Sequence, residues 1–377
     1  MAKRPTVYDV AKQAKVSIAT VSRVLRTPET VRPATRDAVQ DAIRILGYVP
    51  SGSAQGLATQ KTGVIGMFLP GFDAVEQLRD FTPSTKDEAL LRPDPPAEGS
   101  ALPQPDRLYF DEVLRGSEIE AWHQGRSLLI NIGLGHSEED ITALVSDMAG
   151  KVDGMVVLAR SIPDATLAFL RRRIPVVMVA NAPQDDLPNA DLVRVSNRKG
   201  MKALVNHLID AHHVDSFAYI AGPDDSPDNH KRYEGFQEAL SFHGINPATA
   251  PIYRGQFRSH LAHDITADLI KRRRLPRALV CANDQMALGA IQALNEAGIA
   301  IPDDVIVTGF DDIKETTSVV PRLTTVRQPM LDLGRAAVSV LAQRIENPTA
   351  PPIAIELPVT VLLRESCEGD MASETRE

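Results

Sequence analysis

The residues with the clearest chemical potential lie near the N-terminus, in segment 17–26. As a helix, this segment buries Val21, Val24 and Leu25 on one face and leaves apolar, hydroxyl and arginine side chains on the other: Ile18, Ala19, Ser22, Arg23 and Arg26. Small side chains let a helix enter the major groove of DNA, and hydroxyls can reach phosphates. An arginine can donate two hydrogen bonds to guanine O6 and N7. The outer face therefore has the composition of a DNA-reading surface.

A second group of polar residues follows the ends of predicted strands. Asn283 follows an apolar run at 277–281, Asp311 follows one at 304–309, and Arg232 opens a predicted helix. Ligands of open α/β sheets bind beyond the carboxyl ends of the strands, so these side chains predict a binding pocket. Their donors and acceptors would suit a polyol. Each residue alone could equally be a loop cap or turn former, since Asn and Asp favour those roles.

Motifs of catalysis are weak or missing from the sequence. Gly133-Leu134-Gly135 follows a predicted strand, but Glu138 stands in place of the third glycine of a dinucleotide-binding motif. Neither the phosphate-binding pattern Gly-x-x-x-x-Gly-Lys-Ser/Thr nor the nucleophile pattern Gly-x-Ser-x-Gly occurs. We therefore expect no enzymatic activity and no cofactor.

Metal ligands are also sparse at the spacings that metal sites use. His260 and His263 have no carboxylate or cysteine at metal-ligand spacing, so we expect both to be exposed. Cys281 and Cys367 are too isolated in the sequence to predict a disulfide framework or a zinc site. The sequence predicts no metal.

Helices on either side must position the DNA-reading face. The helical spacing of Val7, Val10, Ala11 and Ala14 predicts one before it, and Ser17 can cap the helix that carries the face. By this pattern alone, the first two helices could be a hairpin within a core, but such a hairpin has no use for the polar outer face. These two helices and a tight turn predict a helix-turn-helix.

A third helix should complete this small domain. Pro33 suits a first helical position, Val39 and Ile43 share a face with Leu46, and Gly47 is placed to end the helix.

Composition and charge indicate a soluble chain of two parts. The 377 residues, 43% hydrophobic and 24% charged, suffice for two or three domains, and no apolar run is long enough to span a membrane. Residues 1–62 hold ten lysines and arginines against four acidic residues, a net charge of +6, which leaves −14 for the remainder. A basic head on an acidic body fits a nucleic-acid-binding module joined to a different domain, although a chance surplus would look the same.

Beyond residue 63, short apolar runs alternate with amphipathic segments. This alternation indicates parallel sheets with crossover helices, too many for one sheet. The expected strands are 64–69, 127–132, 152–158, 175–180, 217–221, 277–281 and 304–309. The expected helices are 108–124, 137–149, 163–173, 198–212, 228–243, 259–273, 284–297 and 329–345. We predict an α/β core of two doubly wound parallel-sheet subdomains.

The segments Val7-Tyr8-Asp9-Val10-Ala11 and Val16-Ser17-Ile18-Ala19-Thr20-Val21-Ser22-Arg23-Val24-Leu25 resemble the N-terminus of the lactose-repressor (LacI) family of bacterial transcription regulators. The resemblance extends over nearly the whole chain. It implies an all-α helix-turn-helix DNA-binding domain at 1–50, a hinge at 51–62 and a periplasmic-binding-protein-like core at 63–366. The N-subdomain would take about 63–195 and 329–357, and the C-subdomain about 196–328 and 358–366, so that the chain crosses between them three times. Residues 73–107 would be an inserted loop and 367–377 a disordered tail.

The resemblance also assigns site residues. It implies DNA contacts by Thr6, Val7, Ser17, Ile18, Ala19, Thr20, Ser22, Arg23, Arg26, Thr30 and Thr35, and by Ala54 and Leu57 of the hinge. Family hinges form a helix only on DNA, where the leucine enters the minor groove. Gly52 and Gly56 each cost about 1 kcal/mol in a helix, which fits a helix that cannot hold alone but equally fits a flexible linker. Effector contacts are implied for Arg232, Phe257, Asn283, Asp311 and Gln328, with Phe257 lying against a sugar face.

The chain departs from the family pattern at several places. Lys15 stands where a turn glycine is usual, Arg32 where a serine-like cap is usual, and Ala180-Asn181 where a strand often ends in aspartate. The Ala180 departure argues against the lactose repressor's own ligands. The Pro-rich insertion at 73–107 is either a tolerated surface loop or a lid over bound effector. After Arg364 no leucine heptads follow, so no tetramer-forming coil is expected.

Together these features predict a cytoplasmic, nucleoid-associated transcription regulator, most simply a repressor. It would act as a homodimer on double-stranded operator DNA, with its affinity controlled by a carbohydrate effector and no role for a membrane. The alternative is a sugar-binding or sugar-modifying protein with a vestigial helical head.

Overall fold

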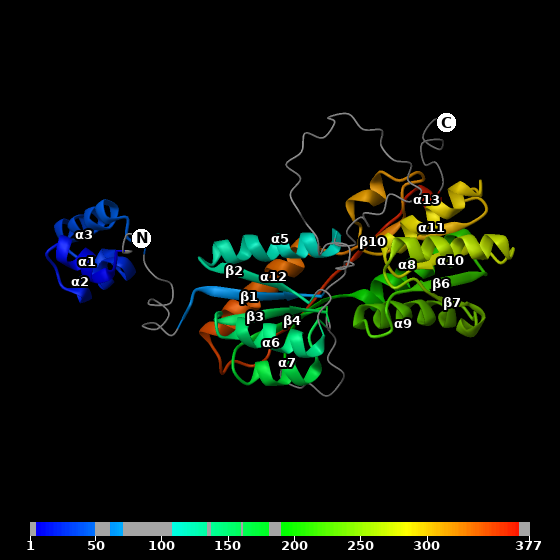
Figure 1. Cartoon of the computed structure of the whole chain (residues 1–377). Coiled ribbons are helices and arrows are strands. Elements are labelled where there is room, and N and C mark those ends of the chain that lie inside the picture. Colours follow the sequence, from blue (N-terminus) through cyan, green and yellow to red (C-terminus); the bar gives the residue numbers. More distant parts are fainter. Residues whose placement is uncertain are drawn as a thin grey trace, which may run out of the picture. The chain divides into compact units, whose positions relative to one another are not determined.

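The chain folds as two compact units, Met1–Gly63 and Val64–Glu377 (Figure 1). The computed structural model describes residues 5–49, 61–70, 108–133, 137–159, 161–180 and 190–368. The predicted hinge contacts Ala54 and Leu57, and the whole of the predicted insertion at 73–107, lie outside these residues.

The first unit contains the three predicted helices around a small core. They are α1 (Val7–Gln13), α2 (Ile18–Arg26) and α3 (Pro33–Leu46), with a short 3-10 turn, η1 (Pro28–Thr30), between the last two. Their inner faces bury Val10, Ala11, Val21, Val24, Val39 and Ala42. The helix-turn-helix predicted from the apolar spacing is therefore confirmed.

Local hydrogen bonds and backbone angles fix the helix ends of this unit. Thr6 and Asp9 bond to each other at the start of α1, and Ser17 Oγ accepts a hydrogen bond of 3.1 Å from the Thr20 amide at the start of α2. Lys15, in the turn, has a φ of 55°, a conformation that favours glycine. Arg32 makes no side-chain cap for α3. At both positions the residue that is usual in the family would be physically favourable, because glycine tolerates the positive φ at 15 and a serine at 32 could cap α3.

The second unit begins with a six-stranded parallel sheet. Its strands are β1 (Val64–Leu69), β2 (Ser127–Ile132), β3 (Gly154–Leu158), β4 (Val176–Val179), β5 (Asp191–Val195) and β11 (Ala354–Leu357), in the spatial order β11-β5-β4-β3-β1-β2. Figure 1 shows α5 (Leu108–His123) and α12 (Met330–Glu346) on one face, and α6 (Glu138–Ala149) and α7 (Asp164–Arg171) on the other. Gly116 and Gly334 let α5 and α12 touch backbone to backbone, since a Cβ at either would lie 2.0 Å from a carbonyl oxygen of the other helix.

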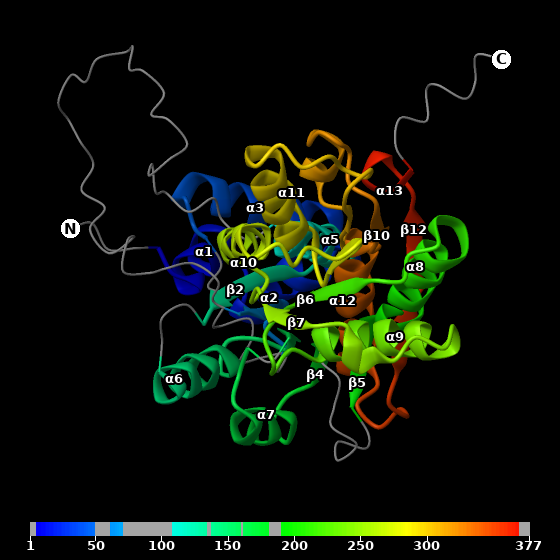
Figure 2. The same cartoon turned by 90° about the vertical axis from the view of Figure 1, so that its right-hand side faces the viewer.

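A four-stranded parallel sheet forms the other half of the core. Its strands are β6 (Phe217–Ala221), β7 (Ile252–Arg254), β8 (Ala278–Cys281) and β9 (Ile306–Thr308), in the order β7-β6-β8-β9. Two helix pairs lie on opposite faces, as Figure 2 shows: α8 (Asn197–His212) with α9 (Pro227–Phe242), and α10 (Ser259–Lys271) with α11 (Asp284–Glu296). Both sheets are doubly wound, as predicted.

The chain passes between the two halves three times. It crosses after β5, again between β10 (Thr325–Arg327) and α12, and finally between β11 and β12 (Thr360–Leu362), which pairs antiparallel with β10. Short 3-10 turns η3 (Pro247–Thr249) and η4 (Lys314–Thr317) and a last helical turn, α13 (Glu365–Glu368), complete the fold. The carboxyl ends of the two parallel sheets face the same cleft between the two halves.

Each predicted helix and strand is present, with ends shifted by at most two residues. Two expectations need correction. The list of strands expected from the sequence did not include five strands that are short or alternate apolar with polar residues: β5, β7, β10, β11 and β12. Residue 367 was assigned to a disordered tail, whereas Cys367 is buried in α13. Over the described ranges, no helix combines the length and apolar character needed to cross a bilayer.

Candidate functional site

A cavity of about 320 Å³ lies between the two sheets of the second unit. One wall comes from the six-stranded side, with Pro70 after β1, Ala159 after β3 and Ala180 after β4, and with Tyr109 and Phe110 at the start of α5. The other wall, from the four-stranded side, contains four of the five predicted effector residues: Arg232, Phe257, Asn283 and Asp311. Its position beyond the strand ends is the one expected for a ligand in such folds.

Arg232 is the centre of the polar wall. The side chain is only 3% exposed, and its guanidinium donates to Asn197 Oδ1 at 2.8 Å and to the Ala282 carbonyl at 2.6 Å. It lies 4.0 Å above the ring of Phe310 and 3.3 Å from Asp311 Oδ1. Fixed on these sides, the guanidinium is held in one orientation toward the cavity.

Asp311 is a buried carboxylate held in a strained backbone. It and Asp312 both have positive φ angles, 130° and 62°, a conformation that costs about 1–3 kcal/mol per non-glycine residue and tends to occur at functional sites. Gln328 Nε2 donates to Asp311 Oδ1 at 2.5 Å. Burial raises the pKa of Asp311 to about 6, although Arg232 and Gln328 act against this shift. A carboxylate in this state can accept hydrogen bonds from ligand hydroxyls at neutral pH.

The remaining predicted residues differ in role. Asn283 is the N-cap of α11, with its Oδ1 accepting a hydrogen bond of 3.0 Å from the Met286 amide, so the loop-cap role and the pocket position coincide. Phe257 packs closely over Gly222, where a Cβ would lie 2.3 Å from the ring. Gln328 was expected to line the pocket, but it contacts the cavity only through Asp311.

The Tyr109 hydroxyl, in the cavity lining, is buried and has no hydrogen-bond partner within the described part of the chain; the same holds for Gln328 Oε1, next to Asp311 but outside the lining. An unsatisfied buried polar group costs about 1–3 kcal/mol, so it tends to be retained where a ligand or water completes it. Asp228 also lines the cavity; Asn197 Nδ2 donates to it at 2.8 Å, and burial raises its pKa. The site thus offers both donors and acceptors to a hydroxyl-rich molecule.

Sequence reasoning missed several residues of the cavity. They are Tyr109, Phe110, Asp225, Ser226, Asp228, Gln256, Arg258 and Gln285. Asp228 could have been found, because it opens the helix after β6 one turn before Arg232. The position of Tyr109 could not, since a long segment separates it from β1.

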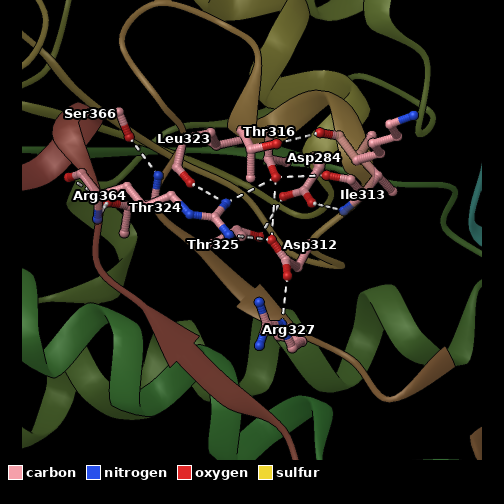
Figure 3. A network of polar contacts seen from close by, with 12 residues as sticks. Asp284, Asp312, Ile313, Thr316, Leu323, Thr324, Thr325, Arg327, Arg364 and Ser366 are labelled. Atoms are coloured by element: carbon pink, nitrogen blue, oxygen red, sulfur yellow. Dashed lines mark hydrogen bonds and ion pairs between the residues drawn. The ribbon is translucent and has the colours of Figure 1, made fainter.

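A network of charged residues supports the loop that carries Asp311 (Figure 3). Asp312 accepts hydrogen bonds of 2.6 Å from Arg327 on β10 and from Arg364 after β12. Burial alone would raise the pKa of Asp312, but the hydrogen bonds from these arginines outweigh it and lower the pKa. Beside it, burial raises the pKa of Asp284 to about 8, while Thr325 donates to its carboxyl at 2.5 Å. These contacts tie the Asp311 loop to β10 and β12, which border two of the three crossings.

The outer face of α2, predicted to read DNA, has the exposure pattern expected from the sequence. Val21 and Val24 are buried, whereas Ser17, Ile18, Ala19, Arg23 and Arg26 are exposed. Thr20 and Ser22 on α2, and Thr6, Val7 and Thr35 on the other helices, are half-buried, and Thr30 is exposed. Neither Arg23 nor Arg26 forms an ion pair within the described residues, which leaves both guanidiniums available.

The prediction that His260 and His263 are both exposed needs one correction. His260 is exposed, but His263 is half-buried and lies 2.9 Å from Glu296.

Comparison with known proteins gives matches along nearly the whole chain. Residues 6–51 match the family described as bacterial regulatory proteins of the lacI family, and residues 205–367 match the periplasmic binding protein-like domain. The ribose operon repressor of Escherichia coli K12 is 30% identical over 363 residues, covering 96% of this chain and 99% of the repressor.

Solved structures give the same result. A lac repressor dimer bound to operator and the anti-inducer ONPF is similar with a TM-score of 0.77 at 25% identity, covering 97% of this chain and 99% of that one. The transcriptional regulator CelR in complex with cellobiose has a TM-score of 0.66 at 26% identity, covering 96% of this chain and 100% of that one.

Proposed function

The chain belongs to the LacI family of bacterial regulatory proteins and is a DNA-binding transcription regulator; we propose that a carbohydrate bound in the inter-sheet cavity controls its affinity for operator DNA. The proposal rests chiefly on one observation. The cavity combines the buried Arg232–Asp311 pair with a buried Tyr109 hydroxyl that has no partner in the described chain. A ligand with several hydroxyl groups can satisfy all three groups at once.

The size and lining of the cavity support a small sugar. A volume of about 320 Å³ falls at the lower end of the range for small-molecule sites. Phe257 and Phe110 provide apolar surface beside the polar groups, as the two faces of a sugar ring require. The CelR structure contains cellobiose. Ala180 lines the cavity at the strand end where the family resemblance implies an aspartate, which favours a ligand different from the lactose repressor's.

On the DNA side, we propose that a homodimer places two copies of α2 in successive major grooves of a near-palindromic operator. Arg23 would read a base and the neighbouring hydroxyls would contact phosphates. The lac repressor structure contains a dimer on operator. Residues 51–62 would join the two units as a hinge, with Leu57 entering the minor groove. The protein would act as a repressor in the cytoplasm, without enzymatic activity.

The test is a thermal-shift screen of mono- and disaccharides. A sugar that binds the native state raises the Tm by linkage, and Asp311→Ala should abolish the shift. Asp303→Ala, at an exposed position, is the control and should keep the shift. A gel shift with genomic fragments then checks that Asp311→Ala still binds operator. A screen in which sugars give no shift and a purine or amino acid does would contradict the ligand class.

A further inference from the structure

Four metal-binding side chains meet where the C-terminal end of the described chain packs against α8. His207 and His212 come from the last turns of α8, and Cys367 and Glu368 from α13. Glu368 Oε1 lies 2.7 Å from His207 Nε2 and 3.1 Å from His212 Nε2, and Cys367 Sγ lies 3.2 Å from His212 Nε2. None of the four lines the effector cavity.

The distances between the ligand atoms match those of a small tetrahedral site. All four ligand atoms lie within 4.8 Å of one another. Zinc bonds of about 2.0–2.3 Å place tetrahedral ligand atoms about 3.3–3.8 Å apart. The printed contacts run from 2.7 to 3.9 Å, on both sides of these values, so side-chain shifts of up to about an ångström would admit an ion.

The chemistry of the four groups also fits. Imidazole nitrogen, thiolate sulfur and carboxylate oxygen are the three ligand types that Zn²⁺ takes in proteins, and four protein ligands make a closed, structural kind of site. The thiolate and carboxylate together carry two negative charges, which balance a divalent ion. Arg277, the cationic neighbour of Cys367, donates to the Pro302 carbonyl at 2.6 Å.

The four side chains are already gathered around one point. Cys367 is only 2% exposed, and the half-buried His207 and His212 both contact the same oxygen of the Glu368 carboxylate.

We propose that His207, His212, Cys367 and Glu368 form a binding site for a borderline-soft divalent ion, of which Zn²⁺ is the best match. Binding would break the Cys367 S–H bond, form a sulfur–metal bond and release the proton to solvent. Each imidazole would keep its single proton on Nδ1 and bind the ion through Nε2. The ion would fasten α13 to α8, two elements separated by more than 150 residues of chain.

The test uses the full-length protein without a histidine tag, first stripped with a chelator. Zn²⁺ affinity is measured by competition with a chromogenic chelator, and Co²⁺ replaces Zn²⁺ for absorption spectra. We expect one ion per chain, a thiolate-to-cobalt charge-transfer band and a higher Tm with metal. Cys367→Ser should remove the band, and both Cys367→Ser and His207→Gln should weaken Zn²⁺ binding more than about 100-fold, beyond what second-shell changes cost.

Two controls separate this site from general metal affinity. His263→Gln changes a histidine whose side chain is as exposed as that of His207, at 26%, and that also contacts a glutamate. Cys281→Ala changes the other buried cysteine. Both variants should keep the affinity and the cobalt band. The site is ruled out if the native protein shows no saturable binding, or if binding survives Cys367→Ser and His207→Gln unchanged.

Discussion

At the scale of single residues, Asp311 is the side chain most directly placed to bind a ligand in the pocket. It lies in a strained loop, pairs with Arg232 and accepts from Gln328, yet burial still raises its pKa to about 6. The free protein therefore holds this carboxylate closer to protonation than an exposed aspartate. Hydrogen bonds from ligand hydroxyls favour the charged form, so effector binding and loss of the proton are linked.

This linkage predicts the pH dependence of effector binding. Affinity should fall as the pH drops through about 6, because the protonated carboxyl of Asp311 loses an acceptor for ligand hydroxyls. Titration calorimetry between about pH 5 and pH 8 measures it. Asp228 lines the same cavity with a raised pKa, so Asp311→Asn is the necessary control. That variant should bind more weakly at neutral pH and lose most of the pH dependence; an unchanged profile would assign the proton to another group.

Arg23 is the corresponding residue of the DNA-binding unit. It is exposed in the middle of α2 and forms no ion pair within the described residues, so it is free to donate to a base. We predict that Arg23→Ala costs about 1–3 kcal/mol of operator binding and relaxes the preference at one base pair per half-site. Fluorescence anisotropy on operator and on mutated operators measures both effects.

The matched variant is Lys3→Ala, which removes a basic residue expected to contact only phosphate. It should weaken binding to operator and to random DNA alike. Equal losses on both kinds of DNA for Arg23→Ala would exclude a role in base readout.

The same residues show how far sequence reasoning reaches. Asn283 and Asp311 could be predicted because strand ends are readable from short apolar runs, and such ends converge in a parallel sheet. Arg232, inside α9, was added by its place on a predicted helix and by the family resemblance. Tyr109 was missed because it begins a helix whose approach to the cavity depends on the packing of the two sheets, whereas Asp228, one turn before Arg232 on α9, could have been found. The cluster around Cys367 was missed for the same kind of reason, since its histidines lie more than 150 residues away in the sequence.

At the scale of elements, the turn between α1 and α2 has an energetic cost in its backbone conformation. The sequence already indicated it, because Lys15 stands where a turn glycine is usual. Lys15 has a φ of 55°, where a residue with a Cβ is strained. We predict that Lys15→Gly stabilises the helical unit by about 0.5–1 kcal/mol, after allowing for the greater freedom of glycine in the unfolded chain. Hydrogen exchange of the α1 and α3 amides in the full-length protein measures this.

Arg32 offers a second change in the same unit, based on a different effect. It is exposed and makes no side-chain cap for α3, so Arg32→Ser should add a cap and about 0.5–1 kcal/mol of stability. Exchange of the first-turn amides of α3 should slow, while that of α1 changes only with global unfolding. Faster exchange in α3 would show that Arg32 has a stabilising role that its exposed position conceals.

The elements that were not predicted share a physical reason. β5 contains Asp191 and Arg194, and β7, β10 and β12 have only three residues each. Such strands carry too little apolar periodicity to be distinguished from loops. These segments become strands because they pair with neighbouring strands. β11, for example, joins the edge of the six-stranded sheet beside β5.

At the scale of the whole molecule, the three crossings connect the two halves of the second unit that enclose the pocket. The two walls of the cavity belong to halves that the chain joins at these crossings, and Asp312 pairs with Arg327 and Arg364 on the two strands that border two of them. A ligand that binds one arrangement of the halves more tightly shifts the population toward it. In a dimer, that shift would change the spacing of the two DNA-binding units.

In the proposed mechanism, ligand binding in the cavity is coupled to DNA binding by the helices of the first unit. The most direct measurement is operator affinity, by anisotropy on a site found by genomic footprinting, with and without a sugar that raises the Tm. We predict that the sugar changes the affinity of the native protein about 5- to 150-fold, the usual range of such coupling. Asp311→Ala should bind the operator as tightly as the sugar-free native protein and show no response. A sugar that binds the cavity but leaves operator affinity unchanged, or a full response in Asp311→Ala, would contradict the account.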